Sequence, residues 1–77
     1  MSLICISVKD MKGIETPLNI NQNKTINEGK KMLGHDINRV WKFDGKVLDW
    51  NQTFLFYEVD NGETIIATDK VVGGIIK

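Results

Sequence analysis

Side chains that could carry chemistry are scarce in this 77-residue chain, which has one cysteine, Cys5, and one histidine, His35. A thiolate nucleophile needs a base beside it, and a structural zinc ion needs about four ligands. Cys5 alternates with two isoleucines along a predicted strand and should lie on the outer face of a sheet, whereas His35 follows a predicted helix. The chain also lacks a phosphate-binding glycine loop and an HExxH motif. We therefore expect a protein that is not an enzyme and has no metal site.

Charge and composition narrow the class further. Ten basic and ten acidic residues balance, so no overall field attracts nucleic acid or an anionic membrane. No apolar run approaches the roughly 20 residues that cross a bilayer. A single cysteine cannot form an internal disulfide, which is typical of the cytosol and nucleus. We expect a small, soluble, cytoplasmic or nuclear monomer that uses no cofactor and binds neither nucleic acid nor membrane.

The chain closes on VVGGIIK, in which Gly73 and Gly74 are followed by three more residues. A glycine pair makes thin, unrestrained backbone that fits a narrow channel, but it is also the commonest composition of a loose tail. The two preceding valines favour extended structure, so the segment could equally continue a strand or begin a linker. The glycine pair alone leaves these interpretations open.

Two strands and a helix are predicted in the first half of the chain. Apolar and polar residues alternate along 4–9 and 16–21, which indicates an antiparallel hairpin whose second strand carries Pro17 and so lies at a sheet edge. Thr25 and Glu28 have the spacing of a capping box, which predicts the start of a short helix of about two to three turns.

The second half returns to strands. Gly34 should end the helix, and residues 40–43 are extended. Asp44-Gly45 predicts a tight hairpin, with Val47 starting the return strand. Residues 64–69 form the last predicted strand. This order predicts an α+β domain in which the helix covers one face of a sheet.

The order and the residues resemble ubiquitin and its β-grasp fold. The chain follows the family spacing without gaps from Ile4 to Leu33 and from Phe43 to Gly74, and only the segment between them is shorter than in ubiquitin. The matching residues are Lys9, Gly13, Leu18, Thr25-Ile26, Lys30, Phe43, Gly45-Lys46, Leu48, Thr53, Tyr57, Thr64 and Gly73-Gly74. The resemblance implies a mixed sheet of four to five strands packed on one short helix within residues 1–72. Residues 73–77 would form a flexible tail.

The resemblance also assigns a core. The expected core residues are Ile6, Val8, Leu18, Ile20, Ile26, Leu33, Trp41, Leu48, Phe54, Val59 and Ile65. Gly29 and Ala67 are smaller than the family's residues at two further core positions. Trp41 and Phe54 are larger than the leucines they replace, so we expect them to fill part of the lost volume.

A contact surface on the open face of the sheet is a further implication of the resemblance. Its four positions are Met11, Lys42, Ile66 and Thr68. Lys42 places a charge at the centre, where interfaces are depleted of charge, so receptors of the standard patch should bind weakly or not at all. The alternative is that these residues are simply the solvated side of a sheet. Trp50 and Phe56 could form a second patch, although aromatic residues near turns more often pack locally.

The resemblance implies a specific role for the C-terminal tail. In ubiquitin-like modifiers the carboxylate of the last glycine is adenylated, transferred to a cysteine as a thioester and joined to a lysine amine. Gly73 and Gly74 stand at that position, Lys70 matches a basic residue used by the activating enzyme, and residues 75–77 resemble the peptide that processing proteases remove. The lysines that match acceptor lysines are Lys46, Lys9 and Lys30. A solvated charge is the simpler interpretation of each of them.

Three functions follow from these residues. The first is a protein modifier conjugated through Gly74 after removal of residues 75–77, with activating enzymes, conjugating enzymes and a processing protease as partners. The second is a non-covalent ubiquitin-like binding domain whose tail is never cleaved. The third is a β-grasp sulfur carrier, which ranks last because such carriers normally end at the glycines.

Overall fold

The computed structural model describes residues 3–68. Lys70, Gly73, Gly74 and the expected boundary after residue 72 lie outside the described residues. The elements in chain order are β1 (Leu3–Lys9), β2 (Glu15–Asn21), α1 (Ile26–Met32), β3 (Val40–Phe43), β4 (Lys46–Val47) and β5 (Thr64–Thr68). This is the order predicted from the sequence, with the helix at the short end of its expected length.

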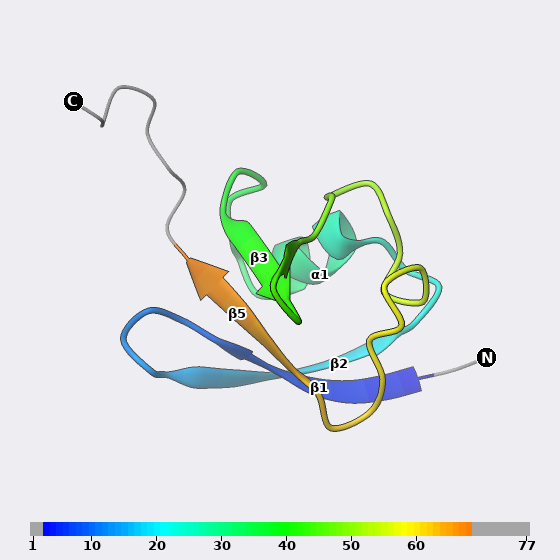
Figure 1. The fold of residues 1–77 in the computed structure, drawn as a ribbon, viewed down its shortest axis with the longest axis horizontal. Coiled ribbons are helices and arrows are strands. Elements are labelled where there is room, and N and C mark those ends of the chain that lie inside the picture. Colours follow the sequence, from blue (N-terminus) through cyan, green and yellow to red (C-terminus); the bar gives the residue numbers. More distant parts are fainter. Residues whose placement is uncertain (1–2, 69–77) are drawn as a thin grey trace.

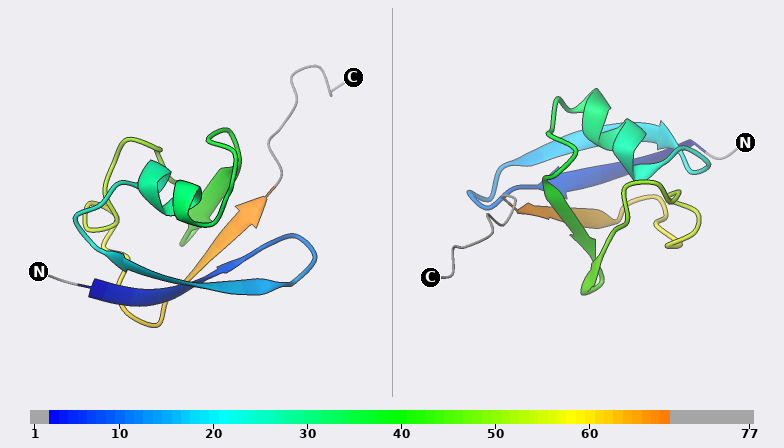
Figure 2. Two further views of the ribbon diagram at one scale, coloured as in Figure 1. Left: turned by 180° about the vertical axis from the view of Figure 1, so that it is seen from behind. Right: turned by 90° about the horizontal axis from the view of Figure 1, so that it is seen from above.

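The five strands form one mixed sheet in the order β2-β1-β5-β3-β4 (Figure 1). β1 is antiparallel to β2 and parallel to β5, and β3 is antiparallel to both β5 and β4. α1 lies on one side of the strands, as the views from behind and from above show (Figure 2). The expected β-grasp arrangement, a mixed sheet with one face covered by a short helix, is confirmed.

Pro17 lies on the edge strand β2, as predicted. Its partner on β1 is Ser7, whose backbone N–H donates a hydrogen bond to the Glu63 carbonyl, 3.1 Å away on the β5 side. Residues that face each other across an antiparallel pair direct their N–H groups the same way, either toward each other or outward. The backbone nitrogen of Pro17 therefore faces away from β1, where a missing N–H breaks no ladder bond.

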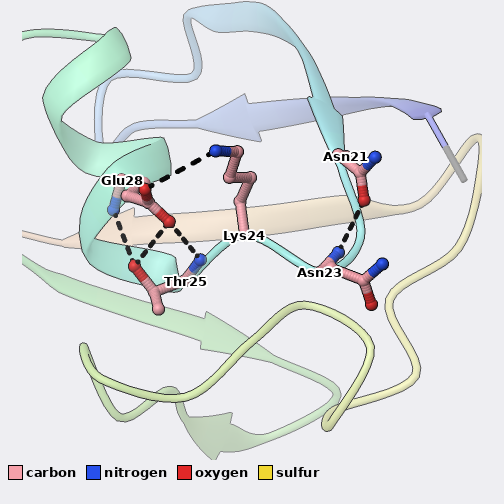
Figure 3. Close-up of polar contacts among 5 residues, drawn as sticks. All are labelled: Asn21, Asn23, Lys24, Thr25 and Glu28. Carbon is pink, nitrogen blue, oxygen red and sulfur yellow. Dashed lines mark hydrogen bonds and ion pairs between the residues drawn. The ribbon is translucent and has the colours of Figure 1, made fainter. Parts of the chain in front are cut away.

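The start of α1 is fixed by the predicted capping box (Figure 3). The Thr25 hydroxyl accepts a hydrogen bond from the Glu28 backbone N–H at 3.2 Å, and the Glu28 carboxylate accepts one from the Thr25 N–H at 2.9 Å. This N–H is the main reason that the pKa of Glu28 is lowered. Lys24 pairs with the same carboxylate at 3.9 Å, and the Asn23 N–H donates to the Asn21 side chain at 2.9 Å in the preceding turn. Local sequence therefore sets where the helix begins.

Backbone conformation ends the helix and turns the second hairpin. Leu33 is the C-cap of α1, and Gly34 has a φ of 73°, the left-handed conformation that stops a helix. Asp44 and Gly45 both have positive φ, 55° and 78°, as a tight hairpin between β3 and β4 requires.

The core is the one expected, except that Leu33 is less deeply buried and Ile4 is added. Leu33 is only partly buried and packs against the core. The buried hydrophobic residues are Ile4, Ile6, Val8, Leu18, Ile20, Ile26, Trp41, Leu48, Phe54, Val59, Ile65 and Ala67. A Cβ atom added to Gly29 would come within 2.7 Å of the Phe54 ring and 3.3 Å of Leu18. The large Phe54 side chain therefore occupies space that a residue bigger than glycine would need.

Candidate functional site

The face of the sheet turned away from α1 carries the candidate contact residues. Trp41 and Ile65 are fully buried, and the residue that follows each of them, Lys42 or Ile66, is exposed. Successive side chains of a strand point to opposite faces. Lys42 and Ile66 therefore lie on the open face, and the exposed fraction of Ile66 is 41%.

Strand register places Lys42 and Ile66 in one row with Lys9 and Val47, across three interfaces between strands. Ile66 on β5 is the Cα partner of Lys9 on β1 and of Lys42 on β3. Lys42 is in turn the partner of Val47 on β4, which is 61% exposed. We call Lys9, Ile66, Lys42 and Val47 the open strip. Within residues 3–68 neither lysine amine of the strip has an ion pair or a hydrogen bond.

The other two residues of the expected surface flank this strip. Thr68 lies two positions after Ile66 on β5, so it points to the same face, and it is half-buried opposite Val40. Met11 lies in the turn between β1 and β2 and is 67% exposed. The structure thus places Lys42, Ile66 and Thr68 on one face, with Met11 at the end of the first hairpin.

The turn that carries Met11 is organised by Asp10. The Asp10 carboxylate accepts hydrogen bonds from the backbone N–H groups of Lys12 at 2.8 Å and Ile14 at 3.0 Å. The bond from Ile14 is the largest cause of the lowered pKa of Asp10. An ionised carboxylate therefore holds the loop that presents the exposed methionine.

The three lysines that match acceptor positions differ in their surroundings. Lys9 and Lys46 are exposed, as a solvated charge would be. Lys30 is only 3% exposed, and its amine donates a hydrogen bond to the Ile37 carbonyl at 2.9 Å. Burial lowers the pKa of Lys30, an effect that the nearby Asp36 opposes. The interpretation of Lys30 as a solvated charge is wrong, because the loop after α1 folds over it.

His35 and Cys5 lie on opposite sides of the sheet. The Trp41 indole N–H donates a hydrogen bond to His35 Nδ1 at 3.1 Å, and the two rings meet edge to face at 5.6 Å between centroids. Cys5 is exposed and shares its side of β1 with Lys9, away from the buried Ile4 and Ile6. The structure therefore assigns His35 to the support of a core tryptophan and does not pair it with the thiol.

This histidine–tryptophan contact was missed from the sequence. A buried indole N–H usually finds an acceptor, so Trp41 at a core position called for one. The pKa of His35 is lowered, first by burial and then by the positive charges of Arg39 and Lys30, with Asp10 opposing. A neutral imidazole is the form that can accept a hydrogen bond at Nδ1.

Local packing, the interpretation favoured from the sequence over a second patch, describes the aromatic residues after β4. Phe56 is 63% exposed and packs edge to face on Tyr57 at 5.0 Å between ring centroids. It lines a groove of about 530 Å³ with Phe43 and Tyr57, and Trp50 is not among the residues of that groove. Local packing therefore describes Phe56 better than a shared surface with Trp50.

Residues 3–68 contain neither a cluster of metal ligands nor a membrane-spanning helix. No group of three or more histidine, cysteine, aspartate or glutamate side chains in that range could hold a metal ion. No helix in the described range is long and apolar enough to cross a membrane.

Comparison with solved structures identifies the fold. The ubiquitin-like domain of Plasmodium falciparum Dsk2 superposes with a TM-score of 0.82 and 23% identity, covering 88% of this chain and 99% of that one. The C-terminal ubiquitin-like domain of human 2'-5'-oligoadenylate synthetase-like protein gives a TM-score of 0.80 and 24% identity over 95% of this chain and 90% of that one. A designed protein based on ubiquitin gives 0.78 and 18%, with 95% of each chain covered. No family model and no curated protein sequence matches the chain.

All three structures share the ubiquitin plan, and each covers at least 88% of this chain. The sheet order, the capped helix and the covered core agree with that plan. This chain therefore has the ubiquitin-like β-grasp fold.

Proposed function

We propose that this chain is a ubiquitin-like protein that acts through protein contacts and is conjugated to other proteins through Gly74. The observation that supports protein contact is the open strip, where exposed aliphatic residues share one face of the sheet with two amines that have no ion pair or hydrogen bond within residues 3–68. The support for conjugation is the position of Gly73 and Gly74, which follows the family spacing without gaps from Phe43. No step of this function requires the chain to be an enzyme itself.

The chemistry of conjugation would proceed in four steps at Gly74. A protease hydrolyses the peptide bond after Gly74 and releases residues 75–77. An activating enzyme then joins the new carboxylate to the AMP of a nucleoside triphosphate, with pyrophosphate leaving. A cysteine thiolate displaces AMP to give a thioester, and a lysine amine displaces the thiol to give an isopeptide. The activating enzyme would bind the basic side chain of Lys70.

A lysine of this chain could also receive another copy. Lys46 and Lys9 are exposed and accessible for such a reaction. Lys30 would first have to release its hydrogen bond to the Ile37 carbonyl. We therefore rank Lys46 and Lys9 above Lys30 as acceptors, in the cytoplasm or nucleus where conjugating enzymes act.

The second candidate is a ubiquitin-like domain that binds without being cleaved or conjugated. Lys42 favours it, because a charge at the centre of the contact surface departs from the patch that ubiquitin receptors read. Two of the similar structures are described as ubiquitin-like domains of named proteins, which is consistent with a domain role. A sulfur carrier remains the third candidate, and the capping box and Gly45-Lys46 hairpin resemble ubiquitin more than that class.

The test is the intact mass of the protein recovered from its own cells, compared with that of a Gly74→Ala variant. A modifier loses residues 75–77 and forms adducts on other proteins, and the variant forms none. A single unmodified species that keeps all three residues would establish the binding domain instead. Adducts that persist in the Gly74→Ala variant would exclude conjugation at Gly74, and an unchanged unfolding curve confirms that the variant is folded.

A further inference from the structure

A groove of about 530 Å³ lies where the hairpin of β3 and β4 meets the segment that leads to β5. Three stretches of the chain contribute to it. The residues that line it are Phe43, Asp44, Lys46, Phe56, Tyr57, Glu58 and Glu63. Three aromatic rings and three carboxylates therefore share this groove with one amine.

The groove is separate from the open strip. Phe43 and Lys46 are Cα partners, and each is the neighbour in sequence of a strip residue, Lys42 or Val47. Successive side chains of a strand point to opposite faces, so Phe43 and Lys46 face away from the strip. Phe43 packs against the core on that side. A partner bound in the groove therefore does not need the open face.

Hydrogen bonds hold the aromatic walls of the groove in place. The Tyr57 hydroxyl accepts one from the Asp49 backbone N–H at 2.8 Å. The Phe56 backbone N–H donates one to the Thr53 hydroxyl at 3.0 Å. The rings of Phe56 and Tyr57 meet at 87°, with 5.0 Å between their centroids. Two perpendicular rings form a corner that presents an aromatic face, and such a face attracts cations.

The balance of charge in the groove is negative. Asp44, Glu58 and Glu63 outnumber Lys46, and all four side chains are exposed. Within residues 3–68 none of the three carboxylates has an ion pair. Glu58 has a φ of 58°, a left-handed conformation that glycine and asparagine adopt more readily than glutamate. The groove therefore offers a cation both aromatic faces and carboxylates that no described residue neutralises.

Arginine is the basic side chain that fits this combination. Its guanidinium is planar, stacks on aromatic rings, forms paired hydrogen bonds with a carboxylate and is weakly hydrated. A lysine ammonium is a compact, strongly hydrated charge without that fork. The one arginine of this chain, Arg39, lies near His35 and does not line the groove. The arginine must therefore come from another molecule.

We propose that this groove binds an arginine side chain of a partner protein. The guanidinium stacks in the corner formed by Phe56 and Tyr57 and donates hydrogen bonds to the carboxylate of Glu58, the next residue in the sequence. The inference rests on the proposed function only in that both assume contact with proteins. It requires neither the open strip nor processing at Gly74.

Three short peptides test this binding to the full-length chain in NMR titrations. Each is acetyl-Gly-Ser-X-Ser-Gly-amide, where X is arginine, lysine or citrulline, the neutral analogue of arginine. The arginine peptide should bind at least about fivefold more tightly than the citrulline peptide, with the lysine peptide between them. The saturable shifts should centre on the backbone amides of residues 43–46, 56–58 and Glu63.

Variants of the protein locate the binding. Glu58→Gln should weaken the arginine peptide about threefold or more, and Phe56→Ala should remove most of its advantage over the lysine peptide. Lys46→Gln should strengthen arginine binding, because it removes the positive charge that opposes the ligand. Glu15→Gln is the matched control and should leave the affinity unchanged. It removes the same charge as Glu58→Gln from an exposed site on β2, at the opposite edge of the sheet from β4.

Four results would overturn the inference. Equal affinity for the arginine and citrulline peptides would show that charge does not select the ligand. Arginine binding that survives both Glu58→Gln and Phe56→Ala, in variants with the unfolding curve of the parent, would place the site elsewhere. Shifts at the groove that depend on the concentration of the chain itself would assign the groove to a second copy.

The fourth result is the absence of any saturable shift at the groove, or tighter binding of choline than of the arginine peptide. The first would exclude the site, and the second would make it a site for a small cation instead. Adducts through Gly74 do not depend on any of these measurements, so the two proposals fail separately.

Discussion

Neighbouring residues of the same strands obey different constraints on the two faces of the sheet. Trp41 and Ile65 are fully buried beneath α1, whereas the next residue along each strand, Lys42 or Ile66, is exposed on the open face. Close packing restricts volume and shape on the covered face. The open face carries no such restriction, so its charge can change while the fold stays ubiquitin-like. The covered face therefore specifies the fold, whereas the composition of the open face can vary without changing the fold.

The largest expected effect is on the free energy of unfolding, and it should distinguish two phenylalanines that are only two positions apart. Phe54 is fully buried and Phe56 is 63% exposed. Phe54→Ala should cost about 3–5 kcal/mol, a large part of the stability of so small a domain. Phe56→Ala should stay within about 0.5 kcal/mol of the parent. Urea unfolding followed by circular dichroism measures both, and equal losses would refute the contrast between buried and exposed sites.

The second prediction concerns Gly29 in α1. The effect of Gly29→Ala on stability should reverse sign when the neighbouring Phe54 is replaced. In the parent protein Gly29→Ala gains about 1 kcal/mol of helix propensity but places a Cβ within 2.7 Å of the Phe54 ring, which should make the variant less stable. In a Phe54→Leu background the ring is gone, and the same change should be stabilising. A double-mutant cycle should give a coupling free energy of about 0.5–3 kcal/mol. Stabilisation in both backgrounds would mean that Phe54 is not the reason that position 29 needs glycine.

Local sequence predicted most of the covered face. The Thr25–Glu28 capping box, the Asp44-Gly45 turn and the alternation of the strands are short-range signals, and the structure confirms each of them. Local sequence did not predict the burial of Lys30, because that burial depends on the carbonyl of Ile37 in a loop that folds back over the helix. Helical periodicity cannot report such a contact.

The open strip was predictable only in part. The family resemblance placed Lys42 and Ile66 on one surface, and the structure agrees. Lys9 belongs to the strip because of the parallel register between β1 and β5, and most of the chain separates these two strands in the sequence. The periodicity within each strand does not determine that register. The register nevertheless decides which charges flank Ile66.

The third prediction tests the contact between His35 and Trp41. Because burial and nearby positive charge lower the pKa of His35 in the folded state, the unfolded chain binds its proton more readily. The stabilisation is complete above the unfolded value of about 6.5 and is lost as pH falls toward the folded pKa. We expect the free energy of unfolding to decrease between pH 8 and pH 5.5, by an amount comparable to one hydrogen bond, about 0.5–1.5 kcal/mol.

A His35→Gln variant is the control for this pH dependence, because glutamine keeps an acceptor for the indole N–H and does not titrate in that range. Its unfolding free energy should change less than that of the parent over the same interval. The interval ends above the pH at which Asp10 and Glu28 titrate, since both have lowered pKa values. An equal pH dependence in both proteins would remove His35 as its source.

The smallest expected effect on stability comes from Lys42, the residue that immediately follows the buried Trp41. Lys42→Ile should change the unfolding free energy by less than about 0.5 kcal/mol, because the side chain is exposed and isoleucine is well suited to a strand. Its binding should nevertheless change, since the variant joins Ile66 and Val47 into continuous aliphatic surface. It should gain affinity for a receptor of the aliphatic ubiquitin patch, measured by titration calorimetry against the parent chain. An unchanged affinity would mean that Lys9 and Thr68 also keep such receptors away, and that the open face has diverged as a whole.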